Sequence, residues 1–104
     1  MSEHIEAIVE NRILELKINR ADKKNALDLA MYQSLADAIL RADKDDDIRV
    51  TLISGVDDSF CSGNDIKDFL KNPPTDDTSP VLQFVRAMIN AEKPIVAAVN
   101  GIAI

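Results

Sequence analysis

Two short apolar runs with a helical segment between them constrain the fold of this chain more than any other feature. Residues 49–54 and residues 95–99 each have the length and the apolar composition of a buried strand. Between them, residues 80–92 carry apolar side chains at helical spacing. Buried strands joined through helices are typical of parallel crossover connections. The sequence therefore predicts an α/β fold.

The chain enters this arrangement through two segments in which apolar and polar residues alternate. Residues 4–9 and 12–18 both have a period of two, and Leu14, Leu16 and Ile18 share one face. Only residues 10–11 separate the segments, and an asparagine there tolerates the positive φ of a tight turn. We predict an antiparallel hairpin that is followed by parallel strands with crossover helices.

Two amphipathic helices are predicted, each with a recognisable start. Asp28 is a suitable N-cap for the first helix, and Ser79 followed by Pro80 is a suitable start for the second. We expect the apolar stripe of each helix to face the core. The first stripe comprises Leu27, Met31, Leu35, Ala38, Ile39 and Ala42, and the second comprises Val81, Leu82, Val85, Met88 and Ile89.

Composition excludes several classes of partner. The chain has 104 residues, enough for one small domain, and its net charge of −6 argues against a nucleic-acid-binding surface. No apolar run is long enough to cross a bilayer, so we expect no membrane association. A single cysteine forms no internal disulfide. We expect a cytoplasmic protein, with an organelle matrix as the alternative.

The C-terminal end of the chain is unusually apolar. Residues 94–104 form an apolar run with no polar tail, whereas the ends of natural domains are usually polar and exposed. We therefore expect residues 1–104 to be a truncated, partial domain.

The stretch from residue 59 to residue 69 is the strongest candidate for a site. It leads from the strand at 49–54 through Gly63 into a predicted helix that contains Ile66, Phe69 and Leu70. A glycine lets the backbone turn sharply, and the first amides of a helix have no internal acceptor. The stretch is either a site for an anion or a carbonyl oxygen, or an ordinary strand-to-helix connection.

Other kinds of site lack residues that they would require. The chain has no second histidine besides His4 and no other obvious base to activate Cys61, so we interpret Cys61 as a small buried side chain rather than a nucleophile. His4 is interpreted as an exposed strand residue. The acidic run 43–47 has calcium-loop spacing, but Ile48 replaces the turn glycine and Ser54 replaces the closing acid. We predict a solvated turn there and no metal site.

Three segments resemble the N-terminal part of the crotonase superfamily, the enoyl-CoA hydratase/isomerase family. They are residues 19–27 (NRADKKNAL), 60–66 (FCSGNDI) and 93–104 (KPIVAAVNGIAI). The resemblance implies a ββα spiral fold and an enzyme of fatty acid metabolism acting on acyl-CoA thioesters, an enoyl-CoA hydratase (a lyase) or an enoyl-CoA isomerase. It implies that the Asn64 backbone N–H is one donor of an oxyanion hole that stabilises a thioester enolate.

The resemblance also implies which residues line the substrate. In the loop before the first helix these are Lys24, Ala26 and Leu27, and in the central motif they are Ser62, Gly63, Asn64, Asp65 and Ile66. No separate cofactor is implied, because coenzyme A is part of the substrate. Family members assemble as homo-trimers or dimers of trimers.

Residues 1–104 lack some of the catalytic groups that the family pattern includes. The second oxyanion donor is expected just past Ile104, and the catalytic glutamates further on. We therefore expect residues 1–104 alone to be inactive. The alternative function is a truncated, non-catalytic fragment that serves as a binding or assembly module. Asn64-Asp65 after the glycine looks more like the Δ3,Δ2-enoyl-CoA isomerase branch, although hydratase and isomerase both remain open.

Overall fold

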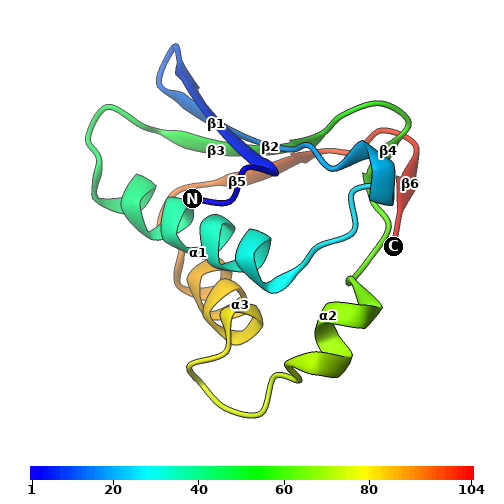
Figure 1. The fold of residues 1–104 in the computed structure, drawn as a ribbon. Coiled ribbons are helices and arrows are strands. Elements are labelled where there is room, and N and C mark those ends of the chain that lie inside the picture. Colours follow the sequence, from blue (N-terminus) through cyan, green and yellow to red (C-terminus); the bar gives the residue numbers. More distant parts are fainter.

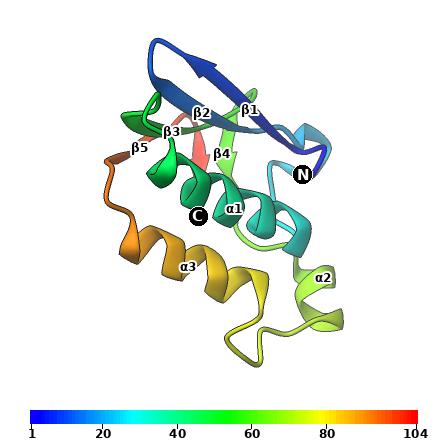
Figure 2. The same ribbon diagram turned by 90° about the vertical axis from the view of Figure 1, so that its left-hand side faces the viewer.

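The computed structural model describes residues 1–104 and has an α/β fold built around a mixed four-stranded sheet (Figure 1). The strand order is β1-β2-β3-β5, with β1 antiparallel to β2 and the other neighbours parallel. Helix α1 lies between the sheet and α3, which is plain in the rotated view of Figure 2. The elements are β1 (Ile5–Glu10), β2 (Ile13–Ile18), a 3₁₀ turn η1 (Ala21–Lys23), α1 (Leu29–Lys44), β3 (Val50–Gly55), β4 (Ser59–Cys61), α2 (Ile66–Lys71), α3 (Pro80–Asn90), β5 (Ile95–Ala98) and β6 (Ile102–Ala103).

The predicted hairpin is confirmed, with its turn one residue later than expected. The turn residues are Asn11 and Arg12, with φ of 52° and 66°, rather than residues 10–11. Glu10 remains extended and pairs with Ile13. Two consecutive residues with positive φ match the twist of the flanking strands, so the two-residue turn joins them without splaying.

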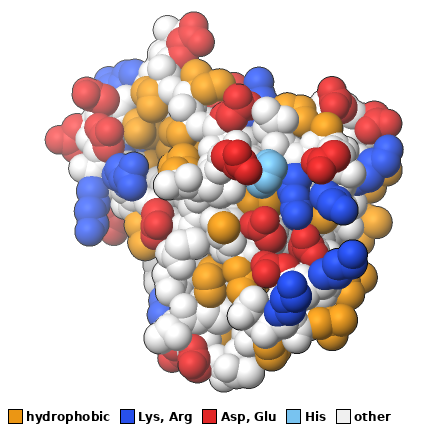
Figure 3. Space-filling view, in the orientation of Figure 1, with side chains coloured by type: hydrophobic (Ala, Val, Ile, Leu, Met, Phe, Trp, Pro, Cys, Tyr) orange, Lys and Arg blue, Asp and Glu red, His pale blue; other side chains and the backbone are white.

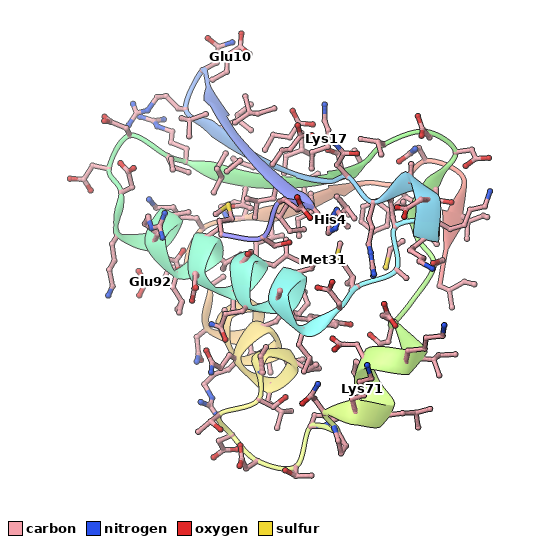
Figure 4. All side chains as sticks on the ribbon, viewed as in Figure 1. His4, Glu10, Lys17, Met31, Lys71 and Glu92 are labelled. Atoms are coloured by element: carbon pink, nitrogen blue, oxygen red, sulfur yellow. The ribbon has the colours of Figure 1, made fainter.

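The core between the sheet and α1 is the one that the sequence predicts. Asp28 caps α1 by accepting a hydrogen bond from the Met31 N–H at 2.8 Å. Met31 points from α1 toward the sheet (Figure 4) and is completely buried, as is Leu16 of β2. All residues of the first predicted stripe are buried.

The prediction for α3 is wrong in part. Helix α3 spans Pro80–Asn90, with Ser79 as its N-cap and Pro80 in its first turn, as predicted. Its only buried residue, however, is Ala87, while Val85, Met88 and Ile89 of the predicted stripe are 42%, 43% and 76% exposed. The reason is that α3 contacts α1 along one edge of its apolar face only, and nothing in the structure covers the other edge.

Strand β5 shows the same pattern. The sequence predicts a buried strand over residues 95–99, but Val96 and Val99 are 49% and 59% exposed. Strand β5 pairs with β3 on one side and is the edge of the sheet on the other. An edge strand without a covering element leaves its apolar side chains in contact with solvent.

A second, two-stranded sheet was not predicted from the sequence. Strand β4 pairs with β6 in parallel, and the ladder extends to a bond from the Ile104 N–H to the Cys61 carbonyl at 2.9 Å. Gly101 makes the turn before β6 with φ of 68°. These strands are too short to have a periodicity of their own, yet they bring Ile104 beside the Gly63 motif. None of the helices is both long and apolar enough to span a bilayer.

Candidate active site

The loop before α1 is hydrogen-bonded to the loop before α2 at the centre of the candidate site. The Leu27 N–H donates to the Gly63 carbonyl at 2.9 Å, and the Asp65 N–H donates to the Leu27 carbonyl at 2.8 Å. This isolated parallel bridge places the two loops side by side, as Figure 1 shows. Residue 64 lies between these two bonds and makes no backbone hydrogen bond to Leu27.

The bridge determines where the Asn64 N–H points. In a trans peptide the carbonyl of one residue and the N–H of the next point in opposite directions. Since the Gly63 carbonyl is directed at the Leu27 N–H, the Asn64 N–H is directed away from it. That N–H donates to no acceptor within the chain. The φ of Gly63 is 103°, a conformation that side chains rarely adopt, so glycine is required at this turn.

Two cavities meet at this motif. One, of about 560 Å³, is lined mostly by hydrophobic residues, and the other, an open cleft of about 860 Å³, is lined mostly by polar residues. The first is lined by Leu27, Tyr32, Cys61, Ser62, Gly63, Asn64, Ile66, Phe84 and Ile104. The second is lined by Arg20, Lys23, Ala26, Asp28, Leu29, Ala30, Ser62, Asn64, Asp65, Ile66, Lys67, Asp68, Lys71 and Asn72. Ser62, Asn64 and Ile66 belong to both.

An ion pair holds the two loops together beneath the cleft. Arg20 donates from Nη1 to Asp65 Oδ2 at 2.9 Å and to the Ala26 carbonyl at 3.1 Å. Asp65 also caps α2 by accepting from the Asp68 N–H at 3.1 Å. The Asp68 amide, and after it the Arg20 side chain, lower the pKa of the Asp65 carboxyl. Asp65 is therefore a structural carboxylate rather than a free acid or base.

Asn25 anchors the first loop from inside. It is fully buried with a positive φ of 61°. Its Nδ2 donates to the carbonyls of Ser59 at 2.7 Å and Val56 at 3.2 Å, and its Oδ1 accepts from the Arg20 N–H at 2.8 Å. One side chain thus connects the first loop to the turn between β3 and β4.

The Asn64 side chain is held as well. Its Oδ1 accepts a hydrogen bond from the Tyr32 hydroxyl of α1. Burial, and then the nearby Cys61, raise the pKa of Tyr32, so its hydroxyl stays protonated and can donate. The Tyr32 ring packs against Phe84 of α3 with centroids 5.4 Å apart.

The polar cleft carries three lysines that form no ion pair. They are Lys23 in the first loop and Lys67 and Lys71 on α2. In Figure 3 charged side chains gather on the right-hand side of the molecule, over α2 and the loop before α1, and Figure 4 places Lys71 on α2. These ammonium groups are available to an anionic ligand, whereas the carboxylates beside them are engaged: Asp68, for example, accepts from the Leu29 N–H at 2.6 Å.

The structure brings together nearly all the residues that the sequence singles out. Lys24 is the exception: it ends η1 with φ of 53° and lines neither cavity, while its neighbour Lys23 does. Ala26, Ser62, Asn64, Asp65 and Ile66 line the polar cleft, and Leu27 and Gly63 line the apolar cavity. His4 and the acidic run 43–47 line neither cavity. His4 was predicted to be an exposed strand residue, but it is half-buried in the turn before β1, with its Nδ1 3.2 Å from the Asn19 carbonyl oxygen. Asp45 Oδ1 accepts from the Asp47 N–H within the acidic turn.

Sequence reasoning missed five supporting residues: Arg20, Asn25, Tyr32, Lys67 and Lys71. The two lysines have a detectable signal, because a spacing of four places them on one face of the helix that follows the motif. The roles of Arg20, Asn25 and Tyr32 depend on contacts between distant segments, which no local pattern reveals.

Comparison with known proteins identifies the family. The enoyl-CoA hydratase/isomerase family model matches residues 9–104. The chain is 32% identical over 110 residues to Escherichia coli 1,2-epoxyphenylacetyl-CoA isomerase, covering 99% of the chain and 42% of the relative. It is 35% identical over 102 residues to human enoyl-CoA delta isomerase 2, covering 91% of the chain and 26% of the relative.

Solved structures give the same result. Pseudomonas aeruginosa OdaA matches with a TM-score of 0.91 and 50% identity, over 96% of this chain and 40% of that one. An enoyl-CoA hydratase/isomerase from Pseudoalteromonas atlantica matches with a TM-score of 0.87 and 39% identity, over 93% and 39%. The chain thus spans less than half the length of these relatives. Its fold is that of the N-terminal portion of the crotonase fold, and the chain belongs to the enoyl-CoA hydratase/isomerase family.

Proposed function

We propose that the intact protein is an enoyl-CoA hydratase or enoyl-CoA isomerase in which the Asn64 backbone N–H is one donor of a thioester oxyanion hole. The observation that carries the proposal is the Asn64 N–H itself, which has no acceptor in the chain and is directed away from Leu27 by the Gly63 peptide. A preorganised amide aimed at developing charge contributes about 3–4 kcal/mol to the stability of a transition state.

The position of Ile104 supports a second oxyanion-hole donor beside the Asn64 N–H. Ile104 is hydrogen-bonded to Cys61, and its Cγ2 atom lies 3.7 Å from the position that a Cβ on Gly63 would occupy. In the intact protein, residues that follow Ile104 therefore start next to Asn64. We propose that one of them supplies the other N–H, so that residues 1–104 are a partial domain with half of the oxyanion hole.

The two cavities fit the two ends of an acyl-CoA. The apolar cavity suits the acyl chain, and the lysine-lined cleft suits the phosphates of coenzyme A. We assign Lys23, Lys67 and Lys71 to the phosphates because they line this cleft. The residues that the resemblance assigns to substrate are Lys24, Ala26, Leu27, Ser62, Gly63, Asn64, Asp65 and Ile66. No further cofactor enters the proposal.

The general acid and base come, in this proposal, from outside residues 1–104. The carboxylates that line the cleft are Asp28, Asp65 and Asp68, and each accepts a backbone N–H or pairs with Arg20. Hydration must position a water, whereas isomerisation moves one proton, so the choice between them depends on carboxylates elsewhere in the intact protein. For the intact protein we propose a homo-trimer or dimer of trimers, in the cytoplasm or an organelle matrix.

An assay of two forms of the protein tests this function. The full-length protein and residues 1–104 are each incubated with crotonyl-CoA, to follow hydration, and with 3-hexenoyl-CoA, to follow isomerisation. We expect turnover of at least one substrate by the full-length protein and none by residues 1–104. Turnover by residues 1–104 would contradict the partial-site proposal. A full-length protein that binds neither thioester would instead favour the alternative, a non-catalytic assembly module, for which the exposed apolar faces of α3 and β5 are the candidate surfaces.

A further inference from the structure

The Asn64 peptide is held at its two backbone neighbours but not at its own N–H. Leu27 fixes the Gly63 carbonyl on one side and the Asp65 N–H on the other. Gly63 has no Cβ, and a Cβ placed there would meet nothing closer than 3.7 Å. The peptide between Gly63 and Asn64 is held by one hydrogen bond, from the Leu27 N–H to its carbonyl, and rotation of the peptide would break that bond. Because Gly63 has no Cβ, its own torsions add little resistance to such a rotation. A third anchor on residue 64 restricts that rotation.

The Asn64 side chain provides the third anchor. Its Oδ1 accepts the hydrogen bond from the Tyr32 hydroxyl, which joins the site to the first turn of α1. We propose that Tyr32 is a positioning residue for the Asn64 backbone N–H and acts through the Asn64 side chain. The inference rests on the proposed function, because it concerns the donor of that oxyanion hole.

Tyr32 is suited to this role by its own rigidity. Its side chain is 9% exposed, and its ring packs at 59° against Phe84. Its backbone N–H is bonded to the Asp28 carbonyl in the first turn of α1. An aromatic ring has only two side-chain torsions to fix, so a buried tyrosine holds its hydroxyl at a defined point. The phenol keeps its proton because burial and Cys61 raise its pKa, and a protonated phenol donates while the amide oxygen accepts.

The competing role is direct contact with substrate, because Tyr32 also lines the apolar cavity. A double-mutant comparison separates the two roles. If Tyr32 acts through Asn64, removal of its hydroxyl has no further effect once the Asn64 side chain is gone. If Tyr32 touches substrate, its removal has the same effect in both backgrounds.

The test uses the full-length protein and the variants Tyr32→Phe, Asn64→Ala and their combination. Tyr32→Phe keeps the ring and its packing on Phe84. We expect each single variant to lower kcat about tenfold with KM changed less than about twofold, and the double variant to match the singles. Gln33→Ala is the matched control, since it removes a 2.9 Å bond from α1 to Gln83 of α3 that does not reach the site. We expect it to retain wild-type kcat. Additive losses, or an unchanged kcat in Tyr32→Phe, would overturn the inference.

An infrared difference spectrum of bound butanoyl-CoA tests the same inference, because a variant that is only less stable would not change the spectrum of the bound ligand. A working oxyanion hole polarises the thioester carbonyl and shifts its band to lower frequency on binding. We expect the full shift in the wild-type and Gln33→Ala proteins and a reduced shift in Tyr32→Phe. If the wild-type protein shows no shift, the proposed function fails. If the wild-type protein shows the shift and Tyr32→Phe retains all of it, only the role of Tyr32 fails.

Discussion

At Gly63, one backbone torsion decides which way the next amide points. A φ of 103° turns the Gly63 carbonyl toward Leu27 and leaves the Asn64 N–H without an acceptor. Asn64 is an exposed residue that lines both cavities, so its N–H is open to a ligand. The residues around it, Arg20 and Asn25 above all, make hydrogen bonds that fix the two loops, and none of these bonds uses the Asn64 N–H.

Asp65 makes the stability of this region depend on pH. Its folded-state pKa is lowered, first by the Asp68 N–H and then by Arg20. The ionised carboxylate therefore contributes stability above its unfolded pKa of about 3.9, and this is lost as pH falls through the lower, folded value. We expect the free energy of unfolding of the full-length protein, from urea titrations between pH 7 and pH 2.5, to decline less steeply in Asp65→Asn than in wild type.

The control is Asp46→Asn, because the Asp46 side chain is exposed and makes no hydrogen bond or ion pair. It should follow the wild-type pH dependence. Identical acid slopes in the wild-type protein and in Asp65→Asn would mean that the Asp65 contacts contribute nothing to folding.

Among the helices and strands, sequence patterns predicted the features that depend on neighbouring residues in the chain. They missed the features that depend on contacts with distant segments. The hairpin and α1 follow from period, capping and the apolar stripe from Leu27 to Ala42, and they were predicted correctly. The face of α3 and the burial of β5 depend on which elements cover them, and periodicity does not contain that information. Strands β4 and β6 are three and two residues long, so they carry no pattern of their own.

The same distinction applies to the candidate site. The motif at residues 62–66 is contiguous, and its location was predicted from a glycine before a helix start. The bond from Tyr32 to Asn64 joins residues 32 positions apart, and that from Arg20 to Asp65 joins residues 45 apart. Such pairs become visible only once the loops have been placed side by side.

The pairing of β6 with β4 depends on Gly101. With φ of 68°, an added Cβ would lie 2.0 Å from the Asp58 carbonyl oxygen, so Gly101→Ala forces a displacement. We expect this variant to lose about 1–3 kcal/mol of unfolding free energy in the full-length protein, from urea titrations. Hydrogen exchange should show faster exchange at the Ile104 amide, which bonds to Cys61, with no change at the Met31 amide in the first turn of α1.

Equal acceleration at both amides would show that Gly101 supports the whole fold rather than the β4–β6 pair. Unchanged exchange at Ile104 would show that the turn relaxes without moving β6. Either result would weaken the assignment of β6 as the element that carries the chain past Gly63.

For the whole molecule, the distribution of apolar surface is the most informative property. Large apolar side chains of α3 and β5, among them Ile89 and Val96, are exposed. Beside them is an apolar cavity of about 720 Å³, lined by thirteen hydrophobic residues and Lys93. Exposed apolar area of this kind usually marks an interaction surface. The relatives are more than twice as long as this chain, so we propose that the remainder of the protein or its partner subunits cover these faces.

The proposed oxyanion hole depends on one hydrogen atom of this chain, the one on the Asn64 backbone nitrogen. Replacing Asn64 by its α-hydroxy acid analogue turns that amide into an ester and deletes the N–H, while the side chain that Tyr32 contacts is retained. The matched control is the same replacement at Asp65, whose N–H bonds to the Leu27 carbonyl and takes no part in the proposed chemistry.

The measurement is kcat of the full-length protein for the enoyl-CoA that it turns over, with unfolding free energy measured in parallel. We expect a loss of roughly two to three orders of magnitude in kcat for the Asn64 ester, with stability close to wild type. For the Asp65 ester we expect reduced stability and a much smaller loss in kcat. A wild-type kcat in the Asn64 ester would contradict the claim that this N–H is an oxyanion-hole donor.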